Sequence, residues 1–180
     1  MTEGKMTAKP TNIGLWLLVV ALFAVAGLLL ARDYKAVKLA DAASPVGKPA
    51  RDAPLTTLSG GSTSLHSFAG HPVWLNFFAT WCPPCKAEMP QIETRYRRLH
   101  GQGLEVVGVD QEETPELIAR FTRPFSITFP IVIDEGPAAA AYGVFALPTS
   151  VFIDARGIVR VVRTGELSPD DMDEYLARIM

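Results

Sequence analysis

The pattern of apolar and polar residues divides the chain into an apolar N-terminal segment and a longer region of alternating elements. Residues 13–31 read IGLWLLVVALFAVAGLLLA and carry no charge. Because a helix needs roughly 20 apolar residues to cross a bilayer, this segment is predicted to be a transmembrane anchor. Residues 1–12 precede it, residues 32–48 form a predicted linker, and residues 49–180 are left for one globular domain.

A cleaved signal peptide is the alternative to an anchor. The apolar core of a signal peptide is usually shorter, about 7–15 residues, which favours the anchor. Ala40-Asp41-Ala42 fits a small-x-small cleavage pattern, although it lies well beyond the apolar run. Basic residues both precede and follow the span, so the positive-inside rule does not decide its orientation.

Strand-like and helix-like patterns alternate in the globular region. Residues 73–79 (VWLNFFA) are apolar on both faces, which is typical of a strand in the middle of a sheet covered by helices. Residues 83–99 carry apolar side chains at helical spacing and predict a helix. The same reasoning predicts strands at 105–110 and 129–133, a short helix at 113–121 and an Ala-rich segment at 138–142.

Hairpins are predicted at both ends of this region. Residues 55–58 and 64–68 flank Gly60-Gly61, a hairpin signal. Residues 149–153 and 158–163 flank a turn that is too short for a parallel crossover, so they are expected to pair antiparallel. Ser168-Pro169 is a helix start and opens the last helix. The order of elements predicts an α/β fold with a mixed sheet flanked by helices.

Composition and charge exclude several classes of protein. The 180 residues are 48% hydrophobic and 20% charged, which is typical of a folded protein. The net charge is -2 and the 17 Lys and Arg residues are dispersed, which argues against nucleic-acid binding. Only two cysteines are present, so the chain is not a multi-disulfide scaffold.

The two cysteines, Cys82 and Cys85, lie where the buried strand ends and the next helix begins. The positive end of a helix favours a thiolate, so the pair is predicted to be redox-active. Cys82 is expected to face solvent and to attack a substrate disulfide, and Cys85 is expected to be partly buried and to release the product. Pro83 and Pro84 have no N–H, which leaves only the Cys85 amide to stabilise the Cys82 thiolate, and we expect a reducing pair.

Metal-based alternatives are disfavoured by the surrounding residues. A zinc site needs four suitably spaced ligands, and His66, His71 and His100 do not have that spacing. Covalent haem attachment would require a histidine directly after Cys85, where the chain has Lys86. We therefore expect no metal, and no cofactor besides the disulfide of the cysteine pair.

The stretch LNFFATWCPPCKAEMP, residues 75–90, closely resembles thioredoxin-like proteins of the TlpA, ResA and CcmG/DsbE type. The resemblance extends over residues 47–180 and includes Leu147-Pro148-Thr149. It implies a thioredoxin-like fold with an N-terminal hairpin and a central insertion. It also implies a thiol–disulfide oxidoreductase that is anchored in the cytoplasmic membrane. Its catalytic domain is then expected on the periplasmic, extracytoplasmic side, and residues 1–12 are expected to form a cytoplasmic N-terminus.

The resemblance implies a substrate-binding set around the cysteines. Pro148 aligns with the family's cis-proline, and Leu147 before it is implied to pair with a substrate strand. A trans proline at the start of an edge strand is the alternative. Trp81 is expected to flank the disulfide, with a plain packing role equally open. Pro83 and Pro84 complete this predicted set.

Glu88 is predicted to handle protons for the cysteine pair. It lies three residues after Cys85, on the same helix face. The resemblance implies that a carboxylate here tunes the cysteines, and burial would raise its pKa toward neutrality. A solvated acid near a helix start is the alternative. Ordinary thioredoxins are implied to carry a buried Asp at the position of Asn76, so this chain has no other candidate for the role.

One group of aromatic residues and one cluster of acidic residues are expected to have structural roles. Clustered aromatic residues are expected in the core: Trp74, Phe77, Phe78 and Phe152. An acidic cluster after the second strand is expected to form a solvated loop, with a substrate rim as the alternative: Asp110, Glu112 and Glu113.

The resemblance implies a reductase that receives electrons from a membrane transporter of the DsbD or CcdA kind, because the chain has no third cysteine. Apocytochrome c is implied as the leading substrate and copper-site assembly proteins as the second. An oxidising disulfide donor stays open, since the sequence does not decide the direction of electron flow. A redox-inactive binding module and a copper metallochaperone are the non-enzymatic alternatives, the latter disfavoured because no Met or His ligand pattern lies nearby.

Overall fold

The computed structural model describes residues 17, 19–27 and 45–180. Residues 19–27 are helical, and residues 45–180 form a separate compact unit. In these described parts of the chain, no helix combines the length and the apolar character that crossing a membrane requires. The predicted anchor is described only at residues 17 and 19–27, and the predicted linker only at residues 45–48, so both segments and their boundaries stay predictions.

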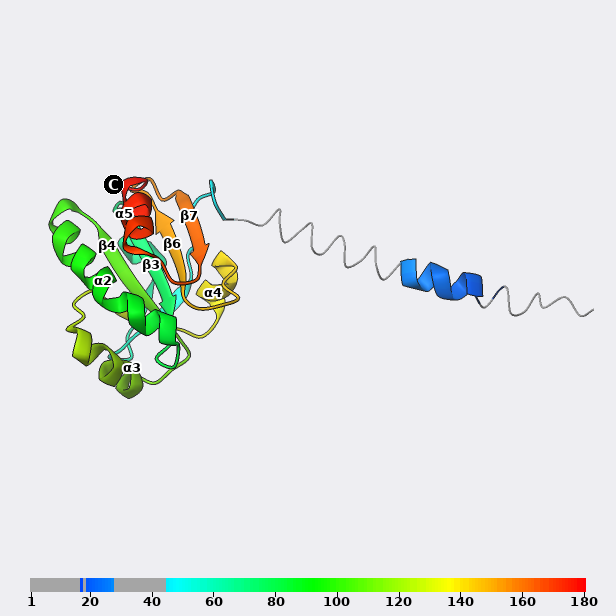
Figure 1. Cartoon of the computed structure of the whole chain (residues 1–180), viewed down its shortest axis with the longest axis horizontal. Coiled ribbons are helices and arrows are strands. Elements are labelled where there is room, and N and C mark those ends of the chain that lie inside the picture. Colours follow the sequence, from blue (N-terminus) through cyan, green and yellow to red (C-terminus); the bar gives the residue numbers. More distant parts are fainter. Residues whose placement is uncertain (1–16, 18, 28–44) are drawn as a thin grey trace, which may run out of the picture. The chain divides into compact units, whose positions relative to one another are not determined.

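A seven-stranded sheet is the framework of the domain (Figure 1). Its strands are β1 (Pro54–Thr57), β2 (Ser62–Ser64), β3 (Val73–Phe78), β4 (Glu105–Gln111), β5 (Ile131–Asp134), β6 (Thr149–Ile153) and β7 (Val159–Thr164). They follow the order β2-β1-β5-β4-β3-β6-β7. β3 is an interior strand, parallel to β4 and antiparallel to β6, and β6 pairs antiparallel with β7. The predicted mixed sheet is therefore confirmed.

Helices cover both faces of the sheet. They are α2 (Pro83–Leu99), α3 (Pro115–Thr122), α4 (Pro137–Tyr142) and α5 (Pro169–Ala177), with short 3-10 turns η1 (Leu65–Phe68), η2 (His100–Gln102) and η3 (Arg123–Phe125). Buried residues of α2, α3 and α5 share one core cluster, whereas η1 and α4 contribute to the cluster on the opposite face. The result is a layered α/β domain of the thioredoxin-like kind.

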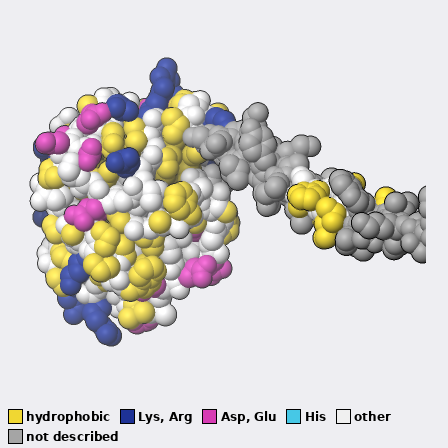
Figure 2. All heavy atoms as spheres, turned by 45° about the vertical axis from the view of Figure 1, so that its right-hand side comes forward, with side chains coloured by type: hydrophobic (Ala, Val, Ile, Leu, Met, Phe, Trp, Pro, Cys, Tyr) yellow, Lys and Arg dark blue, Asp and Glu magenta, His cyan; other side chains and the backbone are white. Residues whose placement is uncertain are grey.

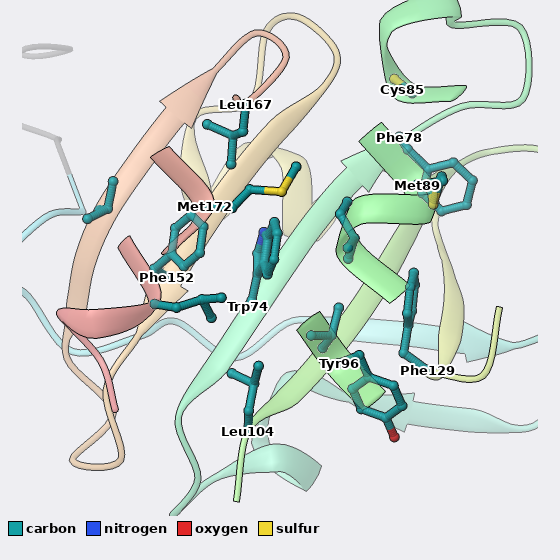
Figure 3. Packing of buried hydrophobic residues seen from close by; sticks show 14 of the residues in the cluster. Trp74, Phe78, Cys85, Met89, Tyr96, Leu104, Phe129, Phe152, Leu167 and Met172 are labelled. Carbon is teal, nitrogen blue, oxygen red and sulfur yellow. The ribbon is translucent and has the colours of Figure 1, made fainter. Parts of the chain in front are cut away.

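All six residues of β3 are buried because both of its faces are covered. Trp74 and Phe78 belong to the cluster with α2 and α5, which Figure 3 shows, and Phe77 belongs to the other cluster. The ring of Trp74 stacks on that of Phe152 with 4.9 Å between centroids. The four aromatic residues predicted to be core are thus all buried.

The predicted elements are confirmed with shifts of one or two residues, and the second arm of the N-terminal hairpin differs more. Residues 65–68 form η1 instead of continuing β2. The amide of Leu65 donates to the Ala53 carbonyl (3.3 Å) and that of His66 to the Asp52 carboxylate (2.9 Å). These bonds turn the backbone out of the strand.

Helix starts behave as the sequence predicted. The Ser168 hydroxyl accepts from the Asp171 amide (3.2 Å), and the Asp171 carboxylate accepts from the Ser168 amide (3.2 Å), a reciprocal capping box. Thr114 caps α3 with Pro115 at the first helical position. Such local chemistry explains why these boundaries are visible in the sequence.

Candidate functional site

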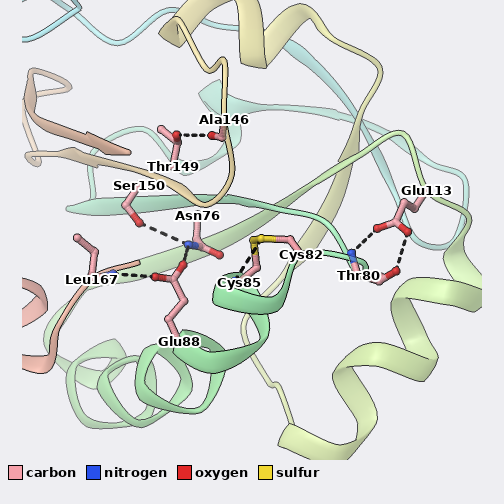
Figure 4. The surroundings of a disulfide bond; sticks show 10 residues. All are labelled: Asn76, Thr80, Cys82, Cys85, Glu88, Glu113, Ala146, Thr149, Ser150 and Leu167. Carbon is pink, nitrogen blue, oxygen red and sulfur yellow. Dashed lines mark hydrogen bonds between the residues drawn. A yellow bond between two sulfur atoms is a disulfide. The ribbon is translucent and has the colours of Figure 1, made fainter. Parts of the chain in front are cut away.

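Cys82 and Cys85 form a disulfide at the start of α2, with 5.3 Å between their Cα atoms (Figure 4). The Cys82 amide donates to the Ala79 carbonyl (3.2 Å), which closes a turn between β3 and α2. Cys82 is the N-cap of α2, and its sulfur accepts from the Cys85 amide at 3.3 Å. Pro83 and Pro84 occupy the first helical positions, so the Cys85 N–H is the backbone donor that this turn offers, as predicted.

The accessibility of the two sulfurs differs from the prediction. Cys82 was expected to face solvent, yet only 3% of its surface is accessible in the disulfide, against 0% for Cys85. Cys82 remains the more accessible of the pair. Both residues belong to the hydrophobic cluster of α2 and α5, against which Leu147 also packs. Most of the Cys82 side chain is therefore covered in the disulfide form.

Glu88 lies buried beneath the pair, with 2% of its surface accessible. Its carboxylate accepts from the Asn76 side-chain amide (2.7 Å) and from the Leu167 backbone amide (3.1 Å), as Figure 4 shows. Burial raises the pKa of Glu88 to about 7, although these two hydrogen bonds oppose the rise and the Glu166 charge adds to it. The solvated alternative is thereby wrong. The carboxyl group can gain or lose a proton near neutral pH beside the cysteines.

Asn76 connects Glu88 to the neighbouring strand. Its side-chain amide also lies 3.4 Å from the Ser150 hydroxyl on β6, and that hydroxyl accepts from the Trp74 indole at 2.9 Å. The side-chain oxygen of Asn76 is buried without a hydrogen-bond partner among the described residues. The side-chain N–H groups of Asn76 thus donate to Glu88 and to Ser150, whereas its side-chain oxygen accepts no hydrogen bond from the described residues.

The Leu147–Pro148 peptide bond is cis, so the trans alternative for Pro148 is wrong. The pairing of Phe77 with Thr149 places this bond directly beside the end of β3. The Thr149 hydroxyl donates to the Ala146 carbonyl (2.8 Å), and the Pro148 carbonyl accepts from the Gly165 amide (2.8 Å). Hydrogen bonds thus hold the backbone on both sides of the cis bond, which lies at the same end of the strands as the disulfide.

Two large apolar side chains near the site are exposed. Trp81 directly precedes Cys82 and is 70% accessible, which excludes a plain packing role. Phe145, three residues before Pro148, is 86% accessible and was missed by the sequence prediction. Figure 2 shows hydrophobic side chains gathered on the lower half of the face in view, the end of the domain that carries α3 in Figure 1.

The acidic cluster after β4 is only partly the predicted solvated loop. Glu112 is exposed, but Asp110 is fully buried. The Glu113 carboxylate accepts from the Thr80 amide (2.5 Å) and from the Thr80 hydroxyl (2.6 Å). Two of the three acids therefore belong to the surroundings of the disulfide. The only sequence signal was their place after a parallel strand beside β3.

Among residues 17, 19–27 and 45–180, no group of three or more His, Cys, Asp or Glu side chains is arranged to hold a metal ion. The structure places three carboxyl groups around the disulfide, those of Glu88, Asp110 and Glu113.

Comparison with known proteins decides the family. Residues 46–162, more than half of the chain, match the model of the AhpC/TSA family. The chain belongs to the AhpC/TSA family. It is 37% identical over 135 residues to the thiol-disulfide oxidoreductase ResA of Bacillus thuringiensis subsp. konkukian, covering 74% of this chain and 78% of the relative. ResA of Geobacillus thermodenitrificans is 38% identical, with the same coverage.

Solved structures of the family have the same architecture. A putative thiol:disulfide interchange protein DsbE from Chlorobium tepidum superposes with a TM-score of 0.68 and 26% identity, over 74% of this chain and 96% of that one. A secreted Mycobacterium tuberculosis disulfide oxidoreductase homologous to E. coli DsbE gives 0.62 and 27%, over 70% and 95%. This AhpC/TSA protein is a thiol–disulfide oxidoreductase of the ResA and DsbE type.

Proposed function

We propose that the protein is an extracytoplasmic reductase of protein disulfides, held at the cytoplasmic membrane by residues 13–31. The observation that carries the proposal is the single backbone donor at the Cys82 sulfur, the Cys85 amide at 3.3 Å. A thiolate with few donors is less stable, which disfavours the dithiol relative to the disulfide. Such a pair tends to pass its electrons to another disulfide.

The reaction then has two steps. The Cys82 thiolate attacks a substrate disulfide, forms a mixed disulfide and releases one substrate thiolate. The Cys85 thiolate next attacks the Cys82 sulfur, which forms the Cys82–Cys85 disulfide and releases the second substrate thiolate. Two electrons pass to the substrate. Glu88 accepts the Cys85 proton in the second step, a role that its burial and its pKa of about 7 support.

Substrate binding is assigned to the exposed surface around the pair. Trp81, Pro83 and Pro84 surround the Cys82 side, and Leu147 before the cis bond pairs with an extended substrate segment. We propose apocytochrome c before haem attachment as the substrate, with copper-site assembly proteins second. A membrane transporter of the DsbD or CcdA kind re-reduces the disulfide, which must receive electrons from another protein because the chain has no further cysteine.

Trapping with Cys85→Ser in the native membrane tests the proposal. Without Cys85, the mixed disulfide at Cys82 cannot be resolved, so the substrate and the electron donor should remain attached and can be identified by mass spectrometry. The double variant, which carries both Cys82→Ser and Cys85→Ser, is the matched control and should trap nothing. Equal trapping by both variants would contradict the assigned roles.

The direction of electron flow is tested by the redox potential. Pro83→His adds an N–H at the helix start, which should stabilise the thiolate and move the potential upward. An unchanged or lower potential would contradict the argument from the prolines. A wild-type potential well above that of glutathione would instead identify an oxidising disulfide donor. Stoichiometric Cu(I) binding would indicate a metallochaperone, and full function of Cys82→Ser would indicate a binding module.

A further inference from the structure

The turn that presents Cys82 is held from outside by a loop of the neighbouring strand. Thr80 lies inside the turn that the Cys82 amide closes on Ala79. Both polar groups of Thr80 donate to the two carboxylate oxygens of Glu113, the amide at 2.5 Å and the hydroxyl at 2.6 Å. Figure 4 shows this Thr80–Glu113 bridge on the Cys82 side of the disulfide, with Glu88 below the pair.

The loop that carries Glu113 is itself fixed. The Glu113 amide donates to the carboxylate of Asp110 at 3.0 Å, and Asp110 pairs with Phe78 in the sheet. Asp110 is fully buried, so its position is set by the core. Glu112 between them has φ of 64°, an uncommon backbone conformation for a residue with a side chain. That conformation is maintained where the surrounding contacts enforce it.

We propose that Glu113 is a positioning residue for Cys82, which fixes the turn of Thr80 so that the Cys82 sulfur is kept within reach of Cys85. The inference rests on the redox activity of the pair and is independent of the substrate and of the direction of electron flow. In the dithiol form no covalent bond holds the turn. The fraction of time in which the two sulfurs are close then depends on the bridge.

The physical consequence concerns the stability of the disulfide. The equilibrium between an intramolecular disulfide and glutathione measures the effective concentration of one thiol at the other. A turn held by two hydrogen bonds from a fixed carboxylate keeps this concentration high. Loosening the turn should lower it, and the pair should become more oxidising.

The chain contains a matched bridge remote from the site. The Glu93 carboxylate accepts from the Thr128 amide (2.8 Å) and from the Thr128 hydroxyl (2.6 Å), the same pattern of donors and acceptors. Glu93 lies on α2 beyond Glu88, and Thr128 precedes β5. Loss of the Glu93–Thr128 bridge therefore controls for a general loss of stability, because this bridge lies away from the cysteines.

The test is the equilibrium of the full chain, in mild detergent, with a reduced and oxidised glutathione buffer. Glu113→Ala should lower the equilibrium constant for disulfide formation about tenfold, equivalent to about 30 mV. Glu113→Gln should stay within about threefold of wild type, because its amide can accept from the Thr80 N–H and donate to the hydroxyl. Thr80→Val, which loses only the hydroxyl, should fall in between. Glu93→Ala should leave the constant unchanged.

Two outcomes overturn the proposal. If Glu113→Ala formed its disulfide with the wild-type equilibrium constant, the Thr80–Glu113 bridge would be irrelevant to the pair. Equal shifts for Glu113→Gln and Glu113→Ala would assign the effect to the charge instead of the bridge. A wild-type chain that fails to exchange with glutathione at all would contradict the redox function itself, which separates that failure from the failure of this inference. Thermal unfolding of each variant verifies that it is folded.

Discussion

Two buried glutamates on the same helix, Glu88 and Glu93, behave in opposite ways. Their accessible fractions are nearly equal, 2% and 5%. The pKa of Glu88 is raised to about 7, whereas that of Glu93 is lowered from its ordinary value. Both lie on α2, so the element does not account for the difference.

The partners of the two carboxylates explain it. Burial raises the pKa of Glu88, and the opposing hydrogen bonds come from two neutral donors, on Leu167 and Asn76. Burial also acts to raise the pKa of Glu93, but hydrogen bonds from Thr128 and from the Arg97 guanidinium outweigh it. Among the described residues, Glu88 forms no salt bridge.

In this pair, the raised pKa goes with neutral partners alone, and the lowered pKa goes with partners that include a guanidinium. The neutral Asn76 beneath the disulfide is part of this arrangement. A cation in its place would keep Glu88 ionised and unable to accept a proton from Cys85. Glu93, with its cation, serves to join α2 to the segment before β5.

The largest predicted effect is the pH dependence that Glu88 gives to stability. Its folded pKa of about 7 lies above the ordinary value of 4.5, so its contribution is fully present below pH 4.5 and is lost as the pH rises through 7. The two values differ by an amount equivalent to about 3 kcal/mol. The free energy of unfolding of wild type, minus that of Glu88→Gln, should fall by about 3 kcal/mol between pH 4.5 and pH 8.

Urea denaturation of both proteins across this range measures the difference. The subtraction removes contributions that the two chains share, including that of Asp110, whose pKa is also raised to about 7 by burial and by the Glu113 charge. A difference that stays constant with pH would show that Glu88 ionises as an ordinary carboxyl group. The contrast with Glu93 would then disappear.

A smaller effect is predicted for the loss of Glu93. Glu93→Ala removes the acceptor of two hydrogen bonds from Thr128 and the carboxylate paired with Arg97, which should cost about 2 kcal/mol of unfolding free energy at pH 7. Because the pKa of Glu93 is lowered, this cost should be present above the ordinary value and should decline as the pH falls below it. The sign is opposite to that of Glu88.

Glu174→Ala is the matched control for this loss. Glu174 forms the same i,i+4 pair with an arginine, Arg178, but 58% of its side chain is exposed. An exposed pair contributes about 0–1 kcal/mol, so Glu174→Ala should change stability little. Equal losses for the two variants would show that the buried contacts of Glu93 add nothing.

The elements and the interior place of β3 could be predicted because each depends on neighbours in the sequence. Periodicity, Gly-Gly and Ser-Pro signals are local, and they locate β3, α2 and α5 to within a residue or two. The prediction for the second arm of the N-terminal hairpin was wrong, because a long-range contact changes the backbone there. His66 bonds to Asp52, and no periodic pattern records that contact.

The part of the site that lies within one sequence motif could be predicted. Cys82, Cys85 and Glu88 lie on one helix, so their spacing alone brings them together. The accessibility of Cys82 and the Thr80–Glu113 bridge depend on segments that meet only in the fold. Glu113 lies beside Thr80 because β3 and β4 are parallel neighbours, which the sequence indicated in outline without indicating the contact.

The smallest predicted effect tests the cause of the contrast itself. Arg97→Gln removes the cation beside Glu93 and keeps a side chain that can donate to it. The side chain of Arg97 is 56% exposed, so the loss of stability should stay below about 1 kcal/mol. The pKa of Glu93, followed by NMR of its side-chain carbonyl, should rise because the guanidinium charge no longer favours the ionised carboxylate. An unchanged pKa would assign the lowering to Thr128, and neutral donors would then suffice to keep a buried carboxylate ionised. In that case the raised pKa of Glu88, which also has two neutral donors, would need a cause other than the missing cation.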